Sequence, residues 1–280
     1  MARRTAQYVE YDDQGSSTFY TPGHVDGGSF NNDAAHEWEY AMGGVATPGL
    51  GLVDASGSVD FRPTDATFIN KALRSTLTGQ PSSLVFETGT DSEAYKHEYA
   101  KIASLSLSGA VNARLSASAS WIAMTPSQIA VPSWGSRHSG DPFHWYQGTV
   151  TVSGGAYTMT EFSVEVNNNV RAFGSLDEAS AGSLRHPEEV IAFQEEVSMT
   201  CTVNVPLGSN AMDVWDDAPP TGLVASLAFT SAAPTTLTIA LANLTLTGWQ
   251  KAYQVNDIVA WALTLTGQPN TADTIAISAA

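Results

Sequence analysis

The sequence predicts a mainly β fold made of two tandem antiparallel units, each a β-sandwich or half-barrel with one flanking α-helix. The first observation behind this prediction is alternation. Leu105 and Leu107 alternate with serines up to Gly109, and the residues from Leu115 to Trp121 alternate in the same way. Successive side chains of a strand point to opposite faces, so each strand has one apolar face and one hydroxyl-lined face.

The second observation is repetition of this hairpin. Three landmarks recur in the same order at a spacing of 139 or 140 residues: Leu105–Gly109 and Leu244–Gly248, Leu84-Val85 and Leu223-Val224, and Trp121 and Trp261. A fixed spacing indicates an internal duplication, although Ser/Thr–Leu alternation also recurs in unrelated β proteins. We therefore expect residues 57–124 and 194–267 to superpose strand for strand.

Composition narrows the class of protein. The 280 residues are 43% hydrophobic and only 14% charged, so Ser, Thr, Asn and Gly must supply much of the surface polarity. The net charge of −16 argues against a protein that grips nucleic acid, because phosphate binding needs clustered cations. Cys201 is the single cysteine, which excludes an intrachain disulfide. The sequence has no apolar run of membrane-spanning length and no recognisable signal peptide.

In chain order, residues 1–36 are polar, without a sustained period, and are interpreted as an N-terminal arm. Residues 37–61 contain short strands interrupted by a Gly- and Pro-rich bend. One helix is predicted over 65–77, capped by Thr64 or Asp65 and ended by Gly79. Its apolar stripe is expected to cover the sheet of the first half. The stripe comprises Phe68, Ile69, Ala72, Leu73 and Leu77.

Residues 125–147 read as a Pro-, Ser- and aromatic-rich crossing loop, after which the plan of the first half repeats. We divide the chain into the arm 1–36, a first half 37–124, the crossing loop 125–147 and a second half 148–280. The expected elements of the second half are strands at 148–152, 161–166, 197–205, 223–229, 237–247 and 259–266, with a short helical piece around Met212 and Trp215. Asn167–Asn169 is predicted to form a turn.

Two clusters have residue types that can bind metals. His138, Asp141 and His144 have an H-x-x-D-x-x-H spacing, but Gly140 and Pro142 exclude the helix that would place them on one face. Asp213, Asp216 and Asp217 offer oxygen ligands for calcium, without a loop of the EF-hand type around them. A loop with exposed histidines is the better interpretation of the first cluster. We expect no metal and no cofactor.

Catalytic patterns are weaker still. Glycosidase chemistry needs two carboxylates across a cleft, and the acids available for it are Glu87, Asp91, Glu93 and Glu98. Their position on a turn beside a strand is typical of a solvated surface. Trp134, Trp145 and Tyr146 could stack on a sugar, but packing in a core or an interface is the commoner role of such rings. No nucleophile elbow or phosphate-binding glycine loop is present, so we expect no enzyme.

Several segments together resemble a family. These are Gly57–Phe61 leading into the helix that ends at Gly79, Leu84–Thr90 leading into Lys101–Ser108, Phe162–Asn169, and Val197–Val205. The pattern resembles the major tail tube subunits of tailed bacteriophages and archaeal viruses, in particular those with two tandem tube-like halves. The resemblance spans most of residues 50–267, and its motifs are structural rather than catalytic.

The resemblance implies a structural protein of the virion tail, assembled in the host cytoplasm. Its partners are then further copies of itself in stacked rings and other tail proteins, with no membrane. Viral DNA passes through the tube without specific binding. With two units per chain, we expect a homotrimeric ring of pseudo-sixfold symmetry; a hexamer is the alternative. The competing function is a β-sandwich adhesin or carbohydrate-binding virion module that uses the aromatic residues of 134–146.

Overall fold

A computed structural model describes residues 8–16, 18–39, 47–73, 79–134, 140–152, 155–156, 158–174, 187–193, 195–206, 223–230, 236–253, 258–267 and 275–279. The chain is almost entirely antiparallel sheet, as the alternation predicted. The elements of the first part are β1 (Tyr8–Asp13), β2 (His24–Glu39), β3 (Thr47–Arg62), α1 (Thr67–Lys71), β4 (Leu84–Gly89), β5 (Ala94–Ala110), β6 (Ser116–Ala123) and β7 (Thr125–Ile129). Those that follow are η1 (Trp145–Gln147), β8 (Gly148–Val152), β9 (Gly155–Ala156), β10 (Thr158–Asn167), β11 (Val170–Phe173), β12 (Glu189–Ala192), β13 (Glu196–Pro206), β14 (Leu223–Thr230), β15 (Thr236–Tyr253), β16 (Ile258–Gly267) and β17 (Ile275–Ala279).

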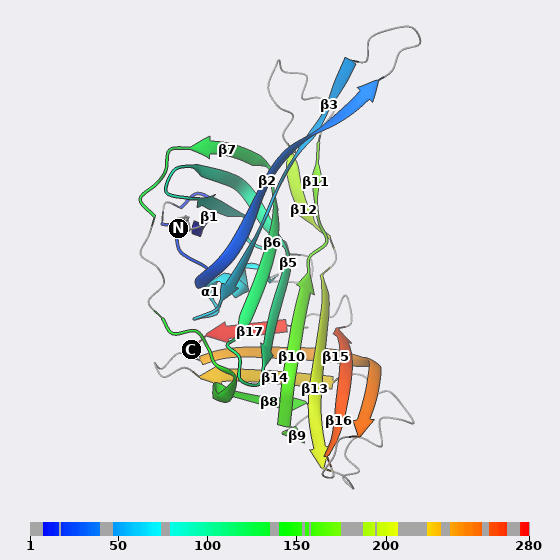
Figure 1. Cartoon of the computed structure of the whole chain (residues 1–280). Helices are drawn as coiled ribbons and strands as arrows, with labels where there is room; N and C mark the ends of the chain where they lie inside the picture. Colours follow the sequence, from blue (N-terminus) through cyan, green and yellow to red (C-terminus); the bar gives the residue numbers. More distant parts are fainter. Residues whose placement is uncertain are drawn as a thin grey trace.

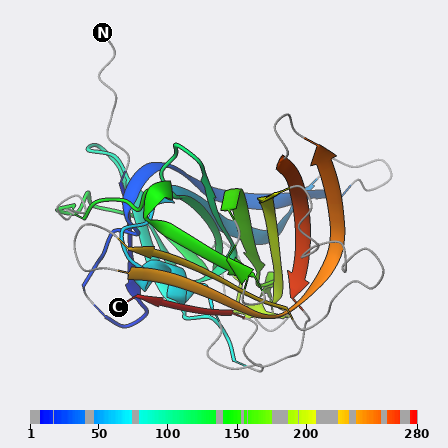
Figure 2. The ribbon, with the colours of Figure 1, turned by 90° about the horizontal axis from the view of Figure 1, so that it is seen from below.

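Eight strands of a fifteen-stranded sheet follow one another in the order β2-β3-β6-β5-β10-β13-β16-β15, and we call these eight the main sheet; the path continues from β15 to β14, β8 and β9. Figure 1 shows β5, β6, β10, β13 and β16 running side by side, with β8, β14 and β17 crossing below them. Seen from below in Figure 2, the main sheet runs from the blue β2 through the green strands to the red and orange β16 and β15. Two sheet layers packed over a shared core make each unit a β-sandwich.

The same pairing pattern occurs twice along the chain. In the first part, β5 pairs with β4, β6 and β7, β6 pairs with β3, β3 with β2, and β4 with β1. In the second, β15 pairs with β14, β16 and β17, β16 pairs with β13, β13 with β10, and β14 with β8. Each strand from β1 to β7 therefore has one counterpart in the second part. This recurrence supports the proposed duplication, while the boundaries of the two halves remain a prediction.

Backbone irregularities fix which residues of β5 and β15 correspond. The extra residue between β5 and β6 is Ala103, and the extra residue between β15 and β16 is Thr247. A left-handed residue also lies at matching places, Tyr99 with φ 53° and Asn243 with φ 55°. Both features relate β5 to β15 by 144 residues, whereas Leu84 and Leu223 lie at matching places of β4 and β14, 139 residues apart.

The spacing of 139 residues was therefore wrong for β5 and β15. The β14–β15 hairpin is longer by five residues than the β4–β5 hairpin. The last pair of β4 and β5 is Gly89–Ala94, whereas pairing of β14 and β15 continues beyond the equivalent position to Thr230–Thr236. The Leu-Ser and Leu-Thr repeats look alike at either spacing because alternation has a period of two. Trp121 pairs with the residue that precedes the β-bulge at Ala103, and Leu265 pairs with the residue that precedes the β-bulge at Thr247. Trp121 is therefore structurally equivalent to Leu265 rather than to Trp261.

The helix is shorter than predicted, because α1 covers only Thr67–Lys71 and not 65–77. Asp65 accepts a hydrogen bond from the backbone N–H of Thr67 at 2.7 Å, while Ala66 occupies the N-cap position. Phe68 and Ile69 are buried, and Leu73 packs on the core from beyond the helix end. Leu77 and the predicted helical piece around Met212 and Trp215 lie outside the described residues.

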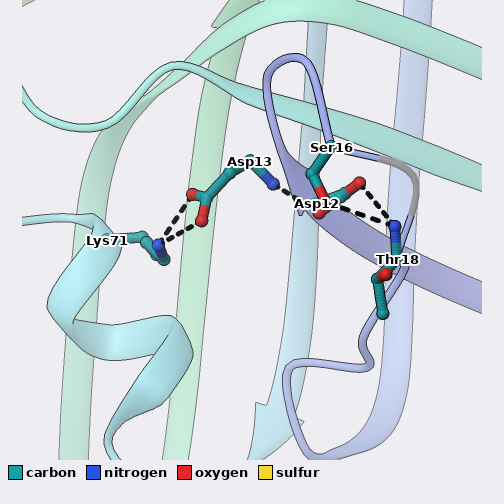
Figure 3. Close-up of polar contacts among 5 residues, drawn as sticks. All are labelled: Asp12, Asp13, Ser16, Thr18 and Lys71. Atoms are coloured by element: carbon teal, nitrogen blue, oxygen red, sulfur yellow. Dashed lines mark hydrogen bonds and ion pairs between the residues drawn. The ribbon is translucent and has the colours of Figure 1, made fainter.

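Polar contacts join the helix to the N-terminal segment. Lys71 binds both carboxylate oxygens of Asp13 at 2.7 Å, and Asp12 accepts a hydrogen bond from the N–H of Thr18 at 3.0 Å (Figure 3). The N–H of Thr18 also lies 3.3 Å from the hydroxyl of Ser16. Together these bonds fix the turn that follows β1 against the end of α1.

The segment interpreted as an irregular arm contains two strands. β1 pairs along its whole length with β4, and Val9 and Tyr11 are buried in the core. β2 begins at His24, so the hairpin of β2 and β3 is much longer than the expected short strands. Its upper part extends beyond the body of the molecule (Figure 1). The crossing loop also begins with a strand, because β7 pairs with β5. Sequence patterns missed these elements because β1 and β2 lack sustained alternation.

Candidate assembly surface

One face of the main sheet is lined by hydroxyl groups. Cross-strand hydrogen bonds link Ser104 to Ser120 at 2.6 Å, Ser108 to Ser116 at 2.9 Å, and Thr247 to Thr266 at 3.0 Å. The opposite face carries the buried Leu, Val and Ala side chains of the core. The hydroxyl face comprises Ser56, Ser58, Ser104, Ser106, Ser108, Ser116, Ser118, Ser120, Ser163, Ser198, Thr200, Thr202, Thr264 and Thr266.

The charges on this face are mainly negative. Four carboxylates share its alternation, from Asp60, Glu161, Glu165 and Glu196, and all four residues are exposed. Arg62, at the end of β3, forms an ion pair with Asp26 at 2.8 Å. Among the described residues, the face therefore presents hydroxyls and carboxylates rather than clustered cations.

The hydroxyl face is also hollowed. A shallow, open concavity of about 520 Å³ crosses β5, β10, β13 and β16 near the β5–β6 turn. Ser108, Glu161, Thr200 and Thr264 line it, together with Arg114 from the turn. The concavity has a mixed polar and apolar lining and includes residues of both halves of the chain.

The main sheet ends in two open edges. Residues 248–253 of β15 pair with β16 on one side and, among the described residues, with no strand on the other. β2 pairs with β3 on one side, and no described strand pairs with its other side. A strand edge without a neighbouring strand can pair with a strand of another chain. β2 begins the strand order and residues 248–253 belong to β15, the last strand of the main sheet, so the two edges lie on opposite sides of the main sheet.

Trp249 marks the apolar side of the β15 edge. It is 44% exposed and lies against Trp261, with ring centroids 5.4 Å apart. Its structural equivalent, Leu105 of β5, is only 3% exposed because β10 pairs with β5 at this point. Trp249 is therefore an exposed tryptophan on the core-facing side of a strand edge.

The candidate metal sites are only partly within the described chain. Asp141 is exposed, His144 stacks on Tyr146 with centroids 5.3 Å apart, and His138 lies outside the described residues. Asp213, Asp216 and Asp217 also lie outside them. No group of three or more His, Cys, Asp or Glu side chains in the described part of the chain is placed to hold a metal ion. That neither cluster binds a metal stays a prediction.

Of the four carboxylates considered for catalysis, two lie on an exposed turn and two lie beside Lys96. Asp91 and Glu93 are exposed on the β4–β5 turn, and Glu98 binds Lys96 at 2.7 Å. Glu87 lies between Glu10 of β1 and Lys96 of β5. Burial raises the pKa of Glu87; Lys96 opposes this shift, whereas Glu10 and Asp12 add to it. This arrangement is a packed charge cluster within a sheet rather than a pair facing a cleft.

The aromatic residues do not form one platform. Trp134 stacks on Tyr8 with centroids 5.0 Å apart, whereas Trp145 and Tyr146 contact each other at 6.1 Å in η1. In the described part of the chain, no ring contact joins Trp134 to the other two. Trp145 and Tyr146 are 40% and 65% exposed, which leaves a two-ring surface near the β5–β6 turn.

Sequence reasoning missed the residues of the two edges. The glycines and asparagines of β2 give no alternation, and the end of β15 was predicted to stop at Thr247. One signal was available: Trp249 continues the alternation of the strand predicted at 237–247. The prediction ended that strand at Thr247 and therefore left Trp249 out.

The described chain thus combines a repeated strand pattern, a sheet that continues through both repeats and two strand edges without a neighbour. The family of phage tail tube proteins matches residues 9–279. The chain therefore belongs to the phage tail tube protein family and is a structural component of the virion tail. A comparison with curated protein sequences finds no match. This is not a family of enzymes, and no described helix is long and apolar enough to cross a membrane.

Proposed function

We propose that this protein is the major tail tube subunit, and that three copies form a ring whose inner wall is the hydroxyl face. The observation that carries this proposal is the pairing of β5 with β10, from Ser104–Asn167 to Ala110–Glu161. It joins four strands from each half into the main sheet, so both halves line the same wall. Closure of the ring removes the two open edges of every subunit.

Strand counting gives the size of the proposed trimer. Three copies of an eight-stranded sheet give a wall of twenty-four strands. With strands about 4.8 Å apart and tilted by about 40°, such a barrel is roughly 50 Å across between backbones. The pseudo-sixfold symmetry arises because each chain contributes two similar four-stranded parts. In the alternative hexamer, one half lines the bore and the other lies outside, which conflicts with a sheet that runs through both halves.

The chemistry of the hydroxyl face suits passage of DNA. The exposed carboxylates repel phosphate, and the hydroxyls offer only weak neutral hydrogen bonds. A wall with clustered lysines and arginines would instead hold the DNA through release of counterions. We infer that the tube conducts the viral genome without specific binding. Assembly in the host cytoplasm and contacts with other tail proteins at the tube ends belong to the same proposal.

Stacking of the rings is assigned to the long hairpin of β2 and β3 and to its counterpart, the connection between β10 and β13. Both leave the main sheet at the same end, where β11 and β12 also lie (Figure 1). Contacts made by one end of a ring with the opposite end of the next give a directional tube rather than a closed particle.

Electron microscopy of the purified protein tests the proposal. We expect rings or tubes with true threefold symmetry. Six identical chains per ring would refute the trimer, while monomers that bind glycans through Trp145 and Tyr146 would favour the adhesin instead. Because the wall is acidic, we also expect assembled tubes not to retain DNA at low salt.

A further inference from the structure

The contact between β5 and β10 within the chain has a counterpart that is missing from the single chain. By the recurring pairing pattern, β5 corresponds to β15 and β10 corresponds to β2. The strand pairing between the two halves, which β5 and β10 make within one chain, is therefore repeated only if β15 of one copy pairs with β2 of another. These are the two open edges of the main sheet.

The equivalence of β2 and β10 is fixed residue by residue. Each strand has one extra residue relative to its hairpin partner, Asp26 in β2 and Thr160 in β10. From these β-bulges, Gly28 corresponds to Phe162 and Asn31 corresponds to Glu165. The β-bulges at Ala103 and Thr247 align β5 with β15 in the same way.

We propose that β15 pairs with β2 of a second copy, antiparallel, in the register that the internal contact defines. The pairs are Asp33–Gly248, Asn32–Trp249, Asn31–Gln250, Phe30–Lys251, Ser29–Ala252 and Gly28–Tyr253. This inference rests on the proposed ring and adds to it the residues that meet across the joint between subunits.

Side-chain volume supports this register. In the internal contact Gly109 lies opposite Phe162, and a Cβ on Gly109 would come within 2.6 Å of the Phe162 ring. In the proposed contact the order is exchanged, with an aromatic residue on β15, Tyr253, and a glycine on β2, Gly28. A glycine opposite an aromatic residue leaves room for the ring, so both joints combine the same pair of sizes. A shift by one residue would lose this match and would also move every side chain to the other face.

The apolar side of the β15 edge fits the same neighbour. The ring of Phe30 lies on the core side of β2, where it stacks on His97 with centroids 3.8 Å apart. In the proposed register Phe30 comes opposite Lys251, beside the 44% exposed ring of Trp249. Lys251 lies over the ring of Trp261 at 4.8 Å, which keeps its hydrocarbon chain along this surface. Pairing would bury Trp249 as β10 buries Leu105.

Disulfide trapping in assembled protein tests the register. The variant Asn31→Cys/Gln250→Cys places two cysteines opposite each other across the joint, on the hydroxyl side. We expect oxidation to give covalent dimers and trimers, and a mixture of the two single variants to give dimers. Cys201 is only 3% exposed and does not compete. The matched control within one chain is Ser106→Cys/Glu165→Cys, whose residues are paired in the structure and should form a disulfide without a change in chain number.

A diagonal variant, Ser29→Cys/Gln250→Cys, distinguishes registers. Diagonal positions lie about 7–8 Å apart, beyond the usual reach of a disulfide. We expect about tenfold less covalent product than from Asn31→Cys/Gln250→Cys. Equal or greater product from the diagonal pair, or none from either pair in tubes that do form, would overturn the register and leave the proposed function intact.

Hydrogen exchange on the unmodified protein gives a measurement that needs no variant. Backbone amides within 28–33 and 248–253 should become protected when isolated subunits assemble, because alternate amides of each edge then donate to the neighbour. Tubes without added protection in these two segments would refute the joint. Failure of the unmodified protein to form any ring would refute the proposed function, and the joint with it.

Discussion

The two halves of this protein fill the same place in the sheet with opposite combinations of side chains. In the first half Gly57 pairs with Trp121, and a Cβ on Gly57 would come within 2.3 Å of the indole ring. In the second half Met199 and Leu265 occupy the equivalent positions, and both are buried. The first half thus pairs glycine, which has no side chain, with tryptophan, which has the largest. The second half pairs two side chains of intermediate size. The pairing pattern has been kept while its side chains have diverged.

The difference extends to polarity. Trp121 stacks on Phe86 at 4.0 Å and donates a hydrogen bond from its indole nitrogen to Nδ1 of His97 at 2.9 Å. At the position equivalent to His97, the second half has Leu241, which is fully buried. The first core therefore depends on a polar contact between rings, and the second depends on aliphatic packing. Four measurements can test and sharpen this comparison.

The largest effect is expected from Trp121→Ala, which removes the stacked ring and the partner of a buried histidine. We expect the free energy of unfolding to fall by about 3–5 kcal/mol. Leu265→Ala at the equivalent place of the second half should cost less, about 2–3 kcal/mol. Chemical denaturation of isolated subunits measures both. An equal cost at the two positions would mean that the contact with His97 contributes nothing.

Asn168 is a second buried polar residue, and it joins the end of β10 to the first half. It is fully buried, and its side-chain nitrogen donates to the carbonyl oxygen of Ala72 at 2.7 Å and to that of Ile102 at 2.9 Å. Asn168→Ala should lower the free energy of unfolding by about 2–3 kcal/mol, because two buried carbonyls lose a donor. The exposed neighbour offers a control, and Asn167→Ala should cost under about 1 kcal/mol. Similar losses from both variants would contradict this role.

His97 predicts a pH dependence confined to the first half. Burial lowers its pKa from 6.5 to about 3, so the unfolded chain binds a proton between these values and the folded chain does not. Stability from this group is present above pH 6.5 and is lost as pH falls toward 3, by about 2 kcal/mol between pH 7 and pH 5. His97→Leu, which copies Leu241 of the second half, should remove that slope. Denaturation of the His97→Leu variant at pH 7 and pH 5 measures this. If the variant loses as much stability between the two pH values as the unmodified protein, His97 is not the source of the slope.

The smallest effect on subunit stability is expected at the open edge. Trp249→Ser changes a side chain that is 44% exposed, so the free energy of unfolding should change by less than about 1 kcal/mol. Assembly should nevertheless be strongly weakened, as the neighbouring copy then loses its apolar contact. Leu105→Ser, at the covered equivalent position, should instead destabilise the subunit itself by several kcal/mol. Sedimentation of the two variants, together with denaturation, separates these outcomes.

Alternation of apolar and hydroxyl residues allowed the sequence alone to predict the main strands, the polar face and the repeat. It did so because the period of two is a local property that each strand carries independently of its neighbours. The acidic, lysine-poor composition likewise indicated a surface that does not hold DNA. The resemblance to tail tube subunits rested on these same strands and agreed with the family match.

The tertiary structure decided everything that depends on pairing between distant residues. Only the structure assigned β1 and the lower part of β2 to sheets, since their hydrogen bonds to β4 and β3 do not require an alternating sequence. It corrected the spacing of β5 and β15, because period-two patterns match at several offsets and only β-bulges distinguish them. It limited the helix to one turn and a half, where packing rather than propensity sets the end. Above all, β5 pairs with β10, and these two strands are far apart in the chain. This pairing makes the main sheet continuous and leaves it with two open edges.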